Sequence, residues 1–396
     1  MVEGKKLKTH SLIDKVYRWS NLASAWEKVK SNKGAGGVDK VSVEQFERRK
    51  EIYLQELYGQ LKGDRYYPLP VRRVYIPKPD GRKRPLGIPT IRDRVVQQAL
   101  LNKLEPIFEK KFHESSFGYR PGKSPHLAMR RVWKELRSGS RWVVEVDIRH
   151  FFDTLDHERL IDFVAEEVAD GRVLELIRRF LKAKVSEDYT LMDVICGTPQ
   201  GGVISPLLAN VYLHKFDVRM AGSGYRATRF ADDLVIICRT KKEAGLALEK
   251  ARQVLENELG LELHPTKTGI VHISQGFEFL GYLVKLGSRG TLFVLPSDSS
   301  IENFKNKVRK ITQRRNPLRL PDMIEELNPV LRGWGNYYRG AHVRRLFHRL
   351  DGWIQRRVWS FKAKRWRNTL WKIYPAKVLY GELGLVNMFR LIPIRT

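Results

Sequence analysis

Residues 224–240 read GYRATRFADDLVIICRT, two runs of β-forming residues joined by Ala-Asp-Asp at 231–233. Two such runs separated by a short polar segment predict a β-hairpin. A third run, RWVVEVDI at residues 141–148, is rich in valine and carries an acid close to its end. The chain therefore places three acidic residues at the ends of apolar strands: Asp147, Asp232 and Asp233.

The segments around these strands predict one unit of strands and helices. A helix is predicted near residues 158–169, an amphipathic helix over 242–260, and a further apolar strand over 276–284 (GFEFLGYLV). The order strand, helix, two strands, helix, strand is that of a ferredoxin-like split βαβ unit. The predicted fold class is therefore α/β, and we expect the three acids to meet at one end of this sheet.

The remainder of the chain divides into an N-terminal part and a helical C-terminal part. Residues 1–60 predict two amphipathic helices around a Gly-rich turn at 31–40, which matches neither a P-loop nor a dinucleotide fingerprint. A hairpin over 72–89 precedes a helix over about 92–111. The character changes again near Leu295, where helical segments begin. We therefore expect three domains: 1–140, 141–295 and 296–396.

The composition indicates a polyanionic partner. The chain has 73 Lys and Arg against 44 Asp and Glu, a net charge of +29 and a pI of about 10.1. Such a charge repels itself unless a polyanion neutralises it, which favours nucleic acid over the alternative, an acidic membrane surface. No apolar run approaches the roughly 20 residues that span a bilayer, and the N-terminus lacks an apolar signal core. We expect a cytoplasmic protein of bacterial type that does not bind membranes.

Two cysteines, Cys196 and Cys238, lie far apart and lack CxxC spacing. A disulfide framework or a zinc site cannot be built from them. Because both follow apolar residues, we expect both thiols to be buried.

The three strand-end acids predict a metal site. Carboxylates that converge in an apolar setting repel one another unless a cation neutralises them. Mg²⁺ prefers such oxygen ligands and keeps substrate phosphates in its coordination sphere. Two Mg²⁺ ions, for which Mn²⁺ can substitute, would suit an in-line phosphoryl displacement. We therefore expect a two-ion site at Asp147, Asp232 and Asp233.

Neighbouring polar residues in FFDTLDH have simpler structural interpretations. Asp153 is expected in a turn, and Asp156 is expected to cap a helix N-terminus. His150 and His157 lack metal-ligand spacing, so we expect them at the surface or in packing contacts. Phe151 is expected in the core.

The motifs taken together resemble the group II intron reverse transcriptases. Five consecutive blocks of that family are similar to residues 143–153, 196–217, 229–236, 259–273 and 277–282 of this chain. Two earlier blocks are similar to 76–100 and 117–128, the N-terminal extension to 20–39, and the thumb, or maturase, domain to 327–340. The resemblance runs in order along nearly the whole chain. It implies a right-hand polymerase in which the N-terminal extension and fingers take 1–140, the palm 141–295 and the thumb 296–396.

The resemblance also assigns roles to individual residues. It makes Asp147, Asp232 and Asp233 catalytic metal ligands and adds the backbone carbonyl of Ile148. It places at Phe152 the aromatic ring that excludes a ribose 2′-OH. The remaining residues that it implies for the incoming nucleotide are Lys78, Arg84, Gln200, Gly201 and Lys267. The implied activity is RNA-directed DNA synthesis from dNTPs on a template RNA with a DNA or RNA primer.

Two departures from the family pattern stand out. Phe230 precedes Ala-Asp-Asp where most members have Tyr, a change that we expect to affect nucleotide handling more than chemistry. No Cys-rich, HNH-type endonuclease segment is found in the sequence. Cleavage of a second DNA strand is therefore not expected.

Basic and aromatic residues alternate near the C-terminus, as in LRGWGNYYRG and WIQRRVW. Residues 297–396 hold 22 basic and 7 acidic side chains, about half of the net charge. Packed aromatics with arginines facing a duplex backbone would suit a helical thumb. The candidate nucleic-acid-binding residues are Arg332, Arg339, Arg344, Arg345, Arg356 and Arg357.

Several biological settings remain open at this stage. The favoured one is an active polymerase of a mobile intron, which also binds structured intron RNA. One alternative is a maturase that acts mainly as an RNA-splicing cofactor. Another is a free-standing relative in host defence, CRISPR spacer acquisition or DNA repair. An RNA-dependent RNA polymerase is disfavoured by Phe152.

Overall fold

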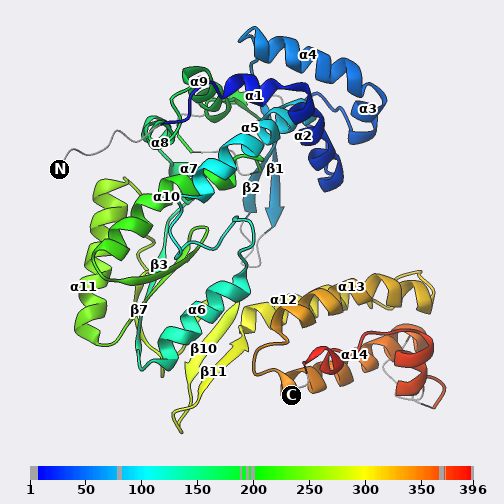
Figure 1. Ribbon diagram of the computed structural model, residues 1–396. Helices are drawn as coiled ribbons and strands as arrows, with labels where there is room; N and C mark the ends of the chain where they lie inside the picture. Colours follow the sequence, from blue (N-terminus) through cyan, green and yellow to red (C-terminus); the bar gives the residue numbers. More distant parts are fainter. Residues whose placement is uncertain are drawn as a thin grey trace. The chain divides into compact units, whose positions relative to one another are not determined.

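A computed structural model describes residues 8–77, 83–187, 190–192, 196–197, 201–364, 370 and 372–393. The chain forms two compact units, one up to residue 270 and one from residue 271 (Figure 1). The second unit thus takes in residues 271–295 together with the C-terminal helices. The domain limits expected from the sequence stay predictions.

The N-terminal segment forms four short helices where two were expected. They are α1 (Ile13–Tyr17), α2 (Trp19–Asn32), α3 (Val43–Arg48) and α4 (Lys50–Lys62). Arg18 has extended backbone angles (φ −50°, ψ 132°), and this separates α1 from α2. Ser42 starts α3 with a complete capping box. Trp26 and Phe46 stack with ring centroids 4.3 Å apart, which joins α2 to α3.

A hairpin follows, as the sequence predicts. β1 (Val71–Pro77) pairs antiparallel with β2 (Lys83–Ile88), and its expected turn at 79–81 lies outside the described residues. β1 also pairs with β4 (Val185–Glu187), which pairs with β5 (Thr190–Met192). The hairpin leads into the long helix α5 (Ile91–Glu109).

The central sheet has the strand order β6-β7-β3-β8. Its strands are β3 (Trp142–Asp147), β6 (Arg226–Phe230), β7 (Asp233–Cys238) and β8 (Gly269–His272). In chain order this is the 4-1-3-2 arrangement of a ferredoxin-like unit, so the predicted palm and the α/β class are confirmed. Helix α11 (Lys241–Arg252) lies along β3 and β7 and continues into the π-helical turn η1 (Gln253–Glu258) (Figure 1).

The remaining helices of this unit carry or brace the segments between the strands. They are α6 (Pro125–Arg137), α7 (Phe151–Thr154), α8 (His157–Ala165), α9 (Gly171–Leu181) and α10 (Ser205–Gly222). Helix α10 packs on β6, and α6 packs on both β6 and β7.

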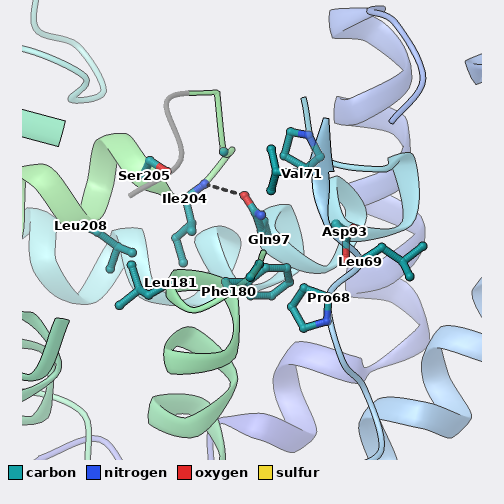
Figure 2. A pocket seen from close by; sticks show the side chains of 13 residues that line it. Pro68, Leu69, Val71, Asp93, Gln97, Phe180, Leu181, Ile204, Ser205 and Leu208 are labelled. Carbon is teal, nitrogen blue, oxygen red and sulfur yellow. Dashed lines mark hydrogen bonds between the residues drawn. The ribbon is translucent and has the colours of Figure 1, made fainter. Parts of the chain in front are cut away.

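A small cavity lies where α5, α9 and the start of α10 meet (Figure 2). The buried side chain of Gln97 accepts a hydrogen bond from the backbone N–H of Ile204 at 3.4 Å across it. The rest of the lining is mostly apolar and includes Phe180 and Leu208. None of the residues predicted for catalysis or nucleotide binding lines this cavity.

The second unit begins with a small sheet that the sequence pattern did not resolve. The single strand expected over 276–284 is a tight hairpin, β9 (Phe277–Phe279) and β10 (Tyr282–Leu286), followed by β11 (Leu292–Pro296). Leu280 and Gly281 both have positive φ, which turns the chain between β9 and β10. The fourth strand of the central sheet is therefore β8 rather than this segment.

Helices make up the rest of the second unit, as expected for a thumb. They are α12 (Asp298–Ile311), α13 (Leu320–Tyr338), α14 (Arg344–Ala363), and the short turns η3 (Val378–Glu382) and η4 (Phe389–Leu391). The buried carboxylate of Asp351 accepts backbone N–H bonds from Met388 and Phe389 and so attaches the C-terminal segment to α14. In the parts of the chain that are described, no helix is long and apolar enough to cross a bilayer.

Candidate active site

Strand register brings the predicted acids to one end of the central sheet. Asp147 of β3 lies directly opposite Asp233 of β7 in their antiparallel ladder. Directly opposed residues share a face, with Cα atoms about 4.5–5.5 Å apart. Phe230 in turn opposes Asp233 across the β6–β7 hairpin, so Ala231 and Asp232 form its two-residue turn. Asp232 therefore lies in this turn, Asp233 follows it at the start of β7, and Asp147 lies opposite Asp233 at the end of β3.

The turn itself is conformationally strained. Ala231 is in the left-handed region, with φ +59°. An L-residue other than glycine or asparagine pays about 1–2 kcal/mol for this conformation. The side chain of Ala231 is buried, whereas Asp233 is exposed. The surrounding structure must therefore hold the turn in place.

A cation already lies against one of the acids. The Nζ atom of Lys267 is 3.0 Å from Oδ2 of Asp147, and both side chains are partly exposed (56% and 38%). The backbone of Asp147 is fixed by Thr268, whose hydroxyl accepts its N–H at 3.2 Å, and by the N–H of His264, which donates to its carbonyl at 2.8 Å. This end of the sheet thus holds a carboxylate that already attracts positive charge.

The structure does not assemble a complete metal site. Across the described residues, no three Asp, Glu, His or Cys side chains converge closely enough to hold an ion. Asp147 turns its carboxylate toward Lys267. The carboxylate oxygens available here are the ligand type that Mg²⁺ prefers, so the residues fit such an ion. The two-ion site stays a prediction.

Ile148 and Phe152 lie just beyond β3. Ile148 is buried and forms a bridge with Leu263. His150, in a left-handed conformation (φ +49°), starts α7, which carries Phe152. The ring of Phe152 is half-buried and meets Phe151 edge-on, with centroids 5.2 Å apart. The roles implied for Ile148 and Phe152 stay predictions.

The other residues implied for nucleotide binding are only partly described. Lys78 and Gln200 lie outside the described residues, and Arg84 is described by its backbone alone, opposite Ile76 in the β1–β2 ladder. Gly201 has φ +121°, and a Cβ there would lie 2.2 Å from the carbonyl oxygen of Gly87. Gly201 therefore allows its loop to pack directly on β2.

A buried arginine behind the turn was not singled out from the sequence. Arg229 of β6 is fully buried, with Nε and Nη2 at 2.9 and 2.5 Å from the carboxylate of Asp217 on α10. Both side chains are completely inaccessible to solvent. Arg229 lies in a strand with a second arginine, and Asp217 follows Lys215 closely in α10, so neither differs in sequence from an ordinary surface charge.

Comparisons with known proteins decide the family. Residues 76–284 match the family model described as reverse transcriptase (RNA-dependent DNA polymerase). The chain belongs to the reverse transcriptase family. Residues 301–376 of the chain match a second model, the group II intron, maturase-specific domain.

Individual relatives agree with this assignment. Protein YkfC of Escherichia coli K12 is 38% identical to this chain, over 68% of this chain and 81% of YkfC. Group II intron-encoded protein LtrA of Lactococcus lactis subsp. cremoris is 31% identical, over 68% of this chain and 55% of LtrA. The chain thus spans about half the length of LtrA. A solved structure, the partial Cas6-RT-Cas1–Cas2 complex, aligns with a TM-score of 0.40 at 22% identity over 65% of this chain and 46% of that one.

Most of the simpler interpretations of residues after Asp147 are confirmed, but Asp153 lies in the short helix α7 rather than in a turn. Asp156 caps α8 through the N–H of Arg159 at 2.8 Å. His150 is exposed, and the buried His157 contacts the carbonyl of Gly197 at 2.6 Å through Nε2. Phe151 is in the core.

The expectation for the cysteines is half right. Cys238 is buried in β7, and burial raises the pKa of its thiol to about 12. Cys196 is exposed, which corrects the expectation that both are buried. Its described neighbourhood is a bend outside the strands, where its thiol reaches the carbonyl of Asp153 at 3.3 Å. Apolar neighbours in sequence do not bury a residue that belongs to no packed element.

The arginines predicted to bind nucleic acid near the C-terminus fall into two groups. Arg357 is half-buried and donates to the Thr312 hydroxyl at 3.0 Å and to the carbonyls of Arg309 and Thr312, so it closes the end of α12. Trp334 stacks on Phe304 at 4.4 Å within the helical core. The exposed members of the predicted set are Arg332, Arg339, Arg344, Arg345 and Arg356.

Proposed function

We propose that this chain is an RNA-directed DNA polymerase, which extends a primer 3′-OH with dNTPs along an RNA template. The observation that carries the proposal is the register of Asp147 against Asp233 beside the Asp232 turn, on a ferredoxin-like sheet. The match of residues 76–284 to the reverse transcriptases supports the same activity. Exposed arginines of the C-terminal helices would contact the phosphates of the template–primer duplex.

Two Mg²⁺ ions would be held by the carboxylates of Asp147, Asp232 and Asp233, and when bound they would supply charge neutralisation for an in-line phosphoryl displacement. The ammonium group of Lys267 lies 3.0 Å from Asp147, within reach of a phosphate at the same place. We assign it to the triphosphate, where its charge would stabilise the departing pyrophosphate. Phe152 would press against the sugar of the incoming nucleotide and exclude a 2′-OH.

A second role, binding of structured intron RNA, is proposed for the C-terminal helices. It is supported by the match of residues 301–376 to the maturase-specific domain of group II introns. LtrA, which is named as a group II intron-encoded protein, is 31% identical to this chain. We therefore favour an intron-encoded enzyme over a free-standing one.

Replacement of a single carboxylate tests the polymerase assignment. Asp232→Asn should reduce primer extension by more than about a thousandfold, because the amide cannot supply the negative charge that holds a metal ion. Template–primer binding, measured by filter binding, should change less than about threefold, because affinity comes from basic side chains elsewhere.

The matched control is Asp156→Asn, which removes the same charge from a nearby exposed position. Asparagine caps a helix as well as aspartate does, so α8 should keep its N-cap. Extension should therefore stay near the wild-type level. Extension by Asp232→Asn within tenfold of wild type would refute the proposed site.

A further inference from the structure

Arg229 makes more contacts than an ion pair requires. Besides Asp217, its Nη1 donates to Oδ1 of Asn210 at 2.8 Å and its Nη2 to the Ser116 hydroxyl at 2.8 Å. Its Nη1 also donates to the backbone carbonyl of Ala231 at 3.1 Å. The guanidinium is therefore bonded to helix α10, to the loop after α5, and to the strained turn that precedes Asp232.

Burial makes this arrangement informative. A fully buried ion pair is seldom retained for stability, because desolvation of both charges offsets most of their attraction. Such a pair instead fixes geometry, because the hydrogen bonds of the planar guanidinium are directional and set the relative positions of the groups that accept them. Here one of those groups is the carbonyl of Ala231, the residue with φ +59°.

The loop after α5 holds the same hairpin by its backbone. The N–H of Arg229 donates to the carbonyl of Ser115, and the N–H of Phe117 donates to the carbonyl of Arg229, both at 2.8 Å. Gly118 packs so closely that a Cβ there would lie 2.3 Å from the N atom of Ala231. Asn210 donates to the carbonyl of Gly118 at 2.8 Å and so links this loop to the arginine.

We propose that Arg229, held by Asp217, is a positioning residue that fixes the Ala231 turn and thereby sets how tightly the Asp232 and Asp233 carboxylates hold divalent cations. The inference rests on the proposed function. Arg229 is too deeply buried to touch a nucleotide or a metal ion, so its effect reaches the reaction through Ala231.

Conservative replacement of the arginine tests the proposal. Arg229→Lys keeps the charge, but a single nitrogen cannot reach Asp217 and the Ala231 carbonyl together with the other acceptors. Mn²⁺ binding, measured by equilibrium dialysis without nucleotide, should weaken about tenfold or more, and extension should require correspondingly more Mg²⁺. At saturating Mg²⁺ the kcat should still fall about a hundredfold, as expected for a displacement near 1 Å. The KM for dNTP should change little.

A milder variant covers the case in which Arg229→Lys does not fold. Ser116→Ala removes one acceptor of the guanidinium and leaves the pair with Asp217 intact. It should weaken Mn²⁺ binding about threefold, a smaller shift because three of the four kinds of contact remain. The melting temperature should fall modestly, because one buried N–H of the guanidinium loses its acceptor.

The matched control is Arg179→Lys on α9. Arg179 is also largely buried and donates to Asp64 and to the carbonyl of Tyr66, each at 3.1 Å. None of its partners belongs to the acidic turn. Its replacement should lower stability while leaving Mn²⁺ binding, kcat and the Mg²⁺ requirement of the folded protein at wild-type values.

The outcomes separate this proposal from the proposed function. Folded Arg229→Lys or Ser116→Ala with wild-type Mn²⁺ binding, alongside an inactive Asp232→Asn, would overturn the positioning role alone. An active Asp232→Asn would overturn the catalytic assignment itself. Equal losses of Mn²⁺ binding in Arg179→Lys and Arg229→Lys would show a general loss of packing and would also refute positioning.

Discussion

The acidic end of the central sheet and the arginines of the C-terminal helices are held in opposite ways. At the sheet, strand register opposes Asp147 to Asp233, and buried contacts fix the backbone of the turn. On the helices, Arg332 and Arg339 extend from α13 and its end as exposed side chains. A site whose geometry depends on buried backbone contacts should lose that geometry when one contact is removed. An exposed charged surface should lose affinity for nucleic acid gradually as its charges are removed.

The largest expected effect tests whether the exposed arginines of the C-terminal helices contribute additively to template–primer affinity. Changing four exposed arginines together should remove up to four phosphate contacts. The logarithm of the affinity falls linearly with the logarithm of the salt concentration, and each phosphate contact adds about 0.9 to the slope. Between 50 and 200 mM salt, the affinity of the variant for template–primer should therefore fall by a factor about a hundredfold smaller than that of the wild type. Filter binding over that salt range measures it. The residues to change to Gln are Arg332, Arg339, Arg344 and Arg345.

Arg357→Gln is the control for this comparison. Its side chain closes the end of α12 rather than facing solvent. The variant should therefore melt earlier and keep a wild-type salt slope. If the fourfold variant keeps the wild-type slope as well, these arginines do not contact the duplex.

A buried acid gives the second prediction, a pH dependence of the N-terminal unit. Burial raises the pKa of Asp93 from an ordinary value near 3.8 to about 6, although Thr90 and Tyr66 both donate hydrogen bonds to its carboxylate. An acid with a raised pKa favours the folded state at low pH, and this contribution is lost as pH rises through about 6. The loss should be about 2 kcal/mol between pH 4 and pH 7.

Asp93→Asn should remove this contribution. Urea unfolding of the variant and of the wild type at several pH values gives the difference in unfolding free energy. That difference should change by about 2 kcal/mol in favour of the variant as pH rises from 4 to 7. Two parallel curves would mean that Asp93 is hydrated in the native protein.

The smallest expected effect concerns the sugar of the nucleotide. Phe152→Val should raise ribonucleotide incorporation relative to dNTP incorporation by about tenfold or more, because removal of the ring makes room for a 2′-OH. Single-nucleotide extension measures the ratio. Phe151→Leu, a change in the adjacent core ring, should lower stability without altering the ratio. An unchanged ratio in Phe152→Val would make that ring a packing residue.

Much of the fold could be predicted because local patterns agreed with it. The apolar runs ending in Asp147 and in Ala-Asp-Asp gave the strands, and their order gave the split βαβ unit. The fourth strand was misplaced because β8 is short and only partly buried, whereas residues 276–284 have the stronger apolar pattern. The turn at Leu280 depends on backbone angles that composition does not reveal.

The acids of the candidate site could be predicted from the sequence, but the buried ion pair that supports them could not. Acids at strand ends are visible in the sequence, and strand register then brings Asp147 and Asp233 together. The contact of Arg229 with Asp217 joins a strand to a helix, and in sequence each residue resembles an ordinary surface charge. Burial of both charges follows from tertiary packing alone.

The close approach of Gly118 to Ala231 limits how this hairpin can be exchanged between related enzymes. If the β6–β7 hairpin alone were transferred to a related chain, Arg229 would be buried there without the residues that bind it in this chain. The smallest portable piece is discontinuous in sequence, because the loop at 115–118 and the α10 segment at 210–217 complete it. A chimera must therefore take all three segments from one parent.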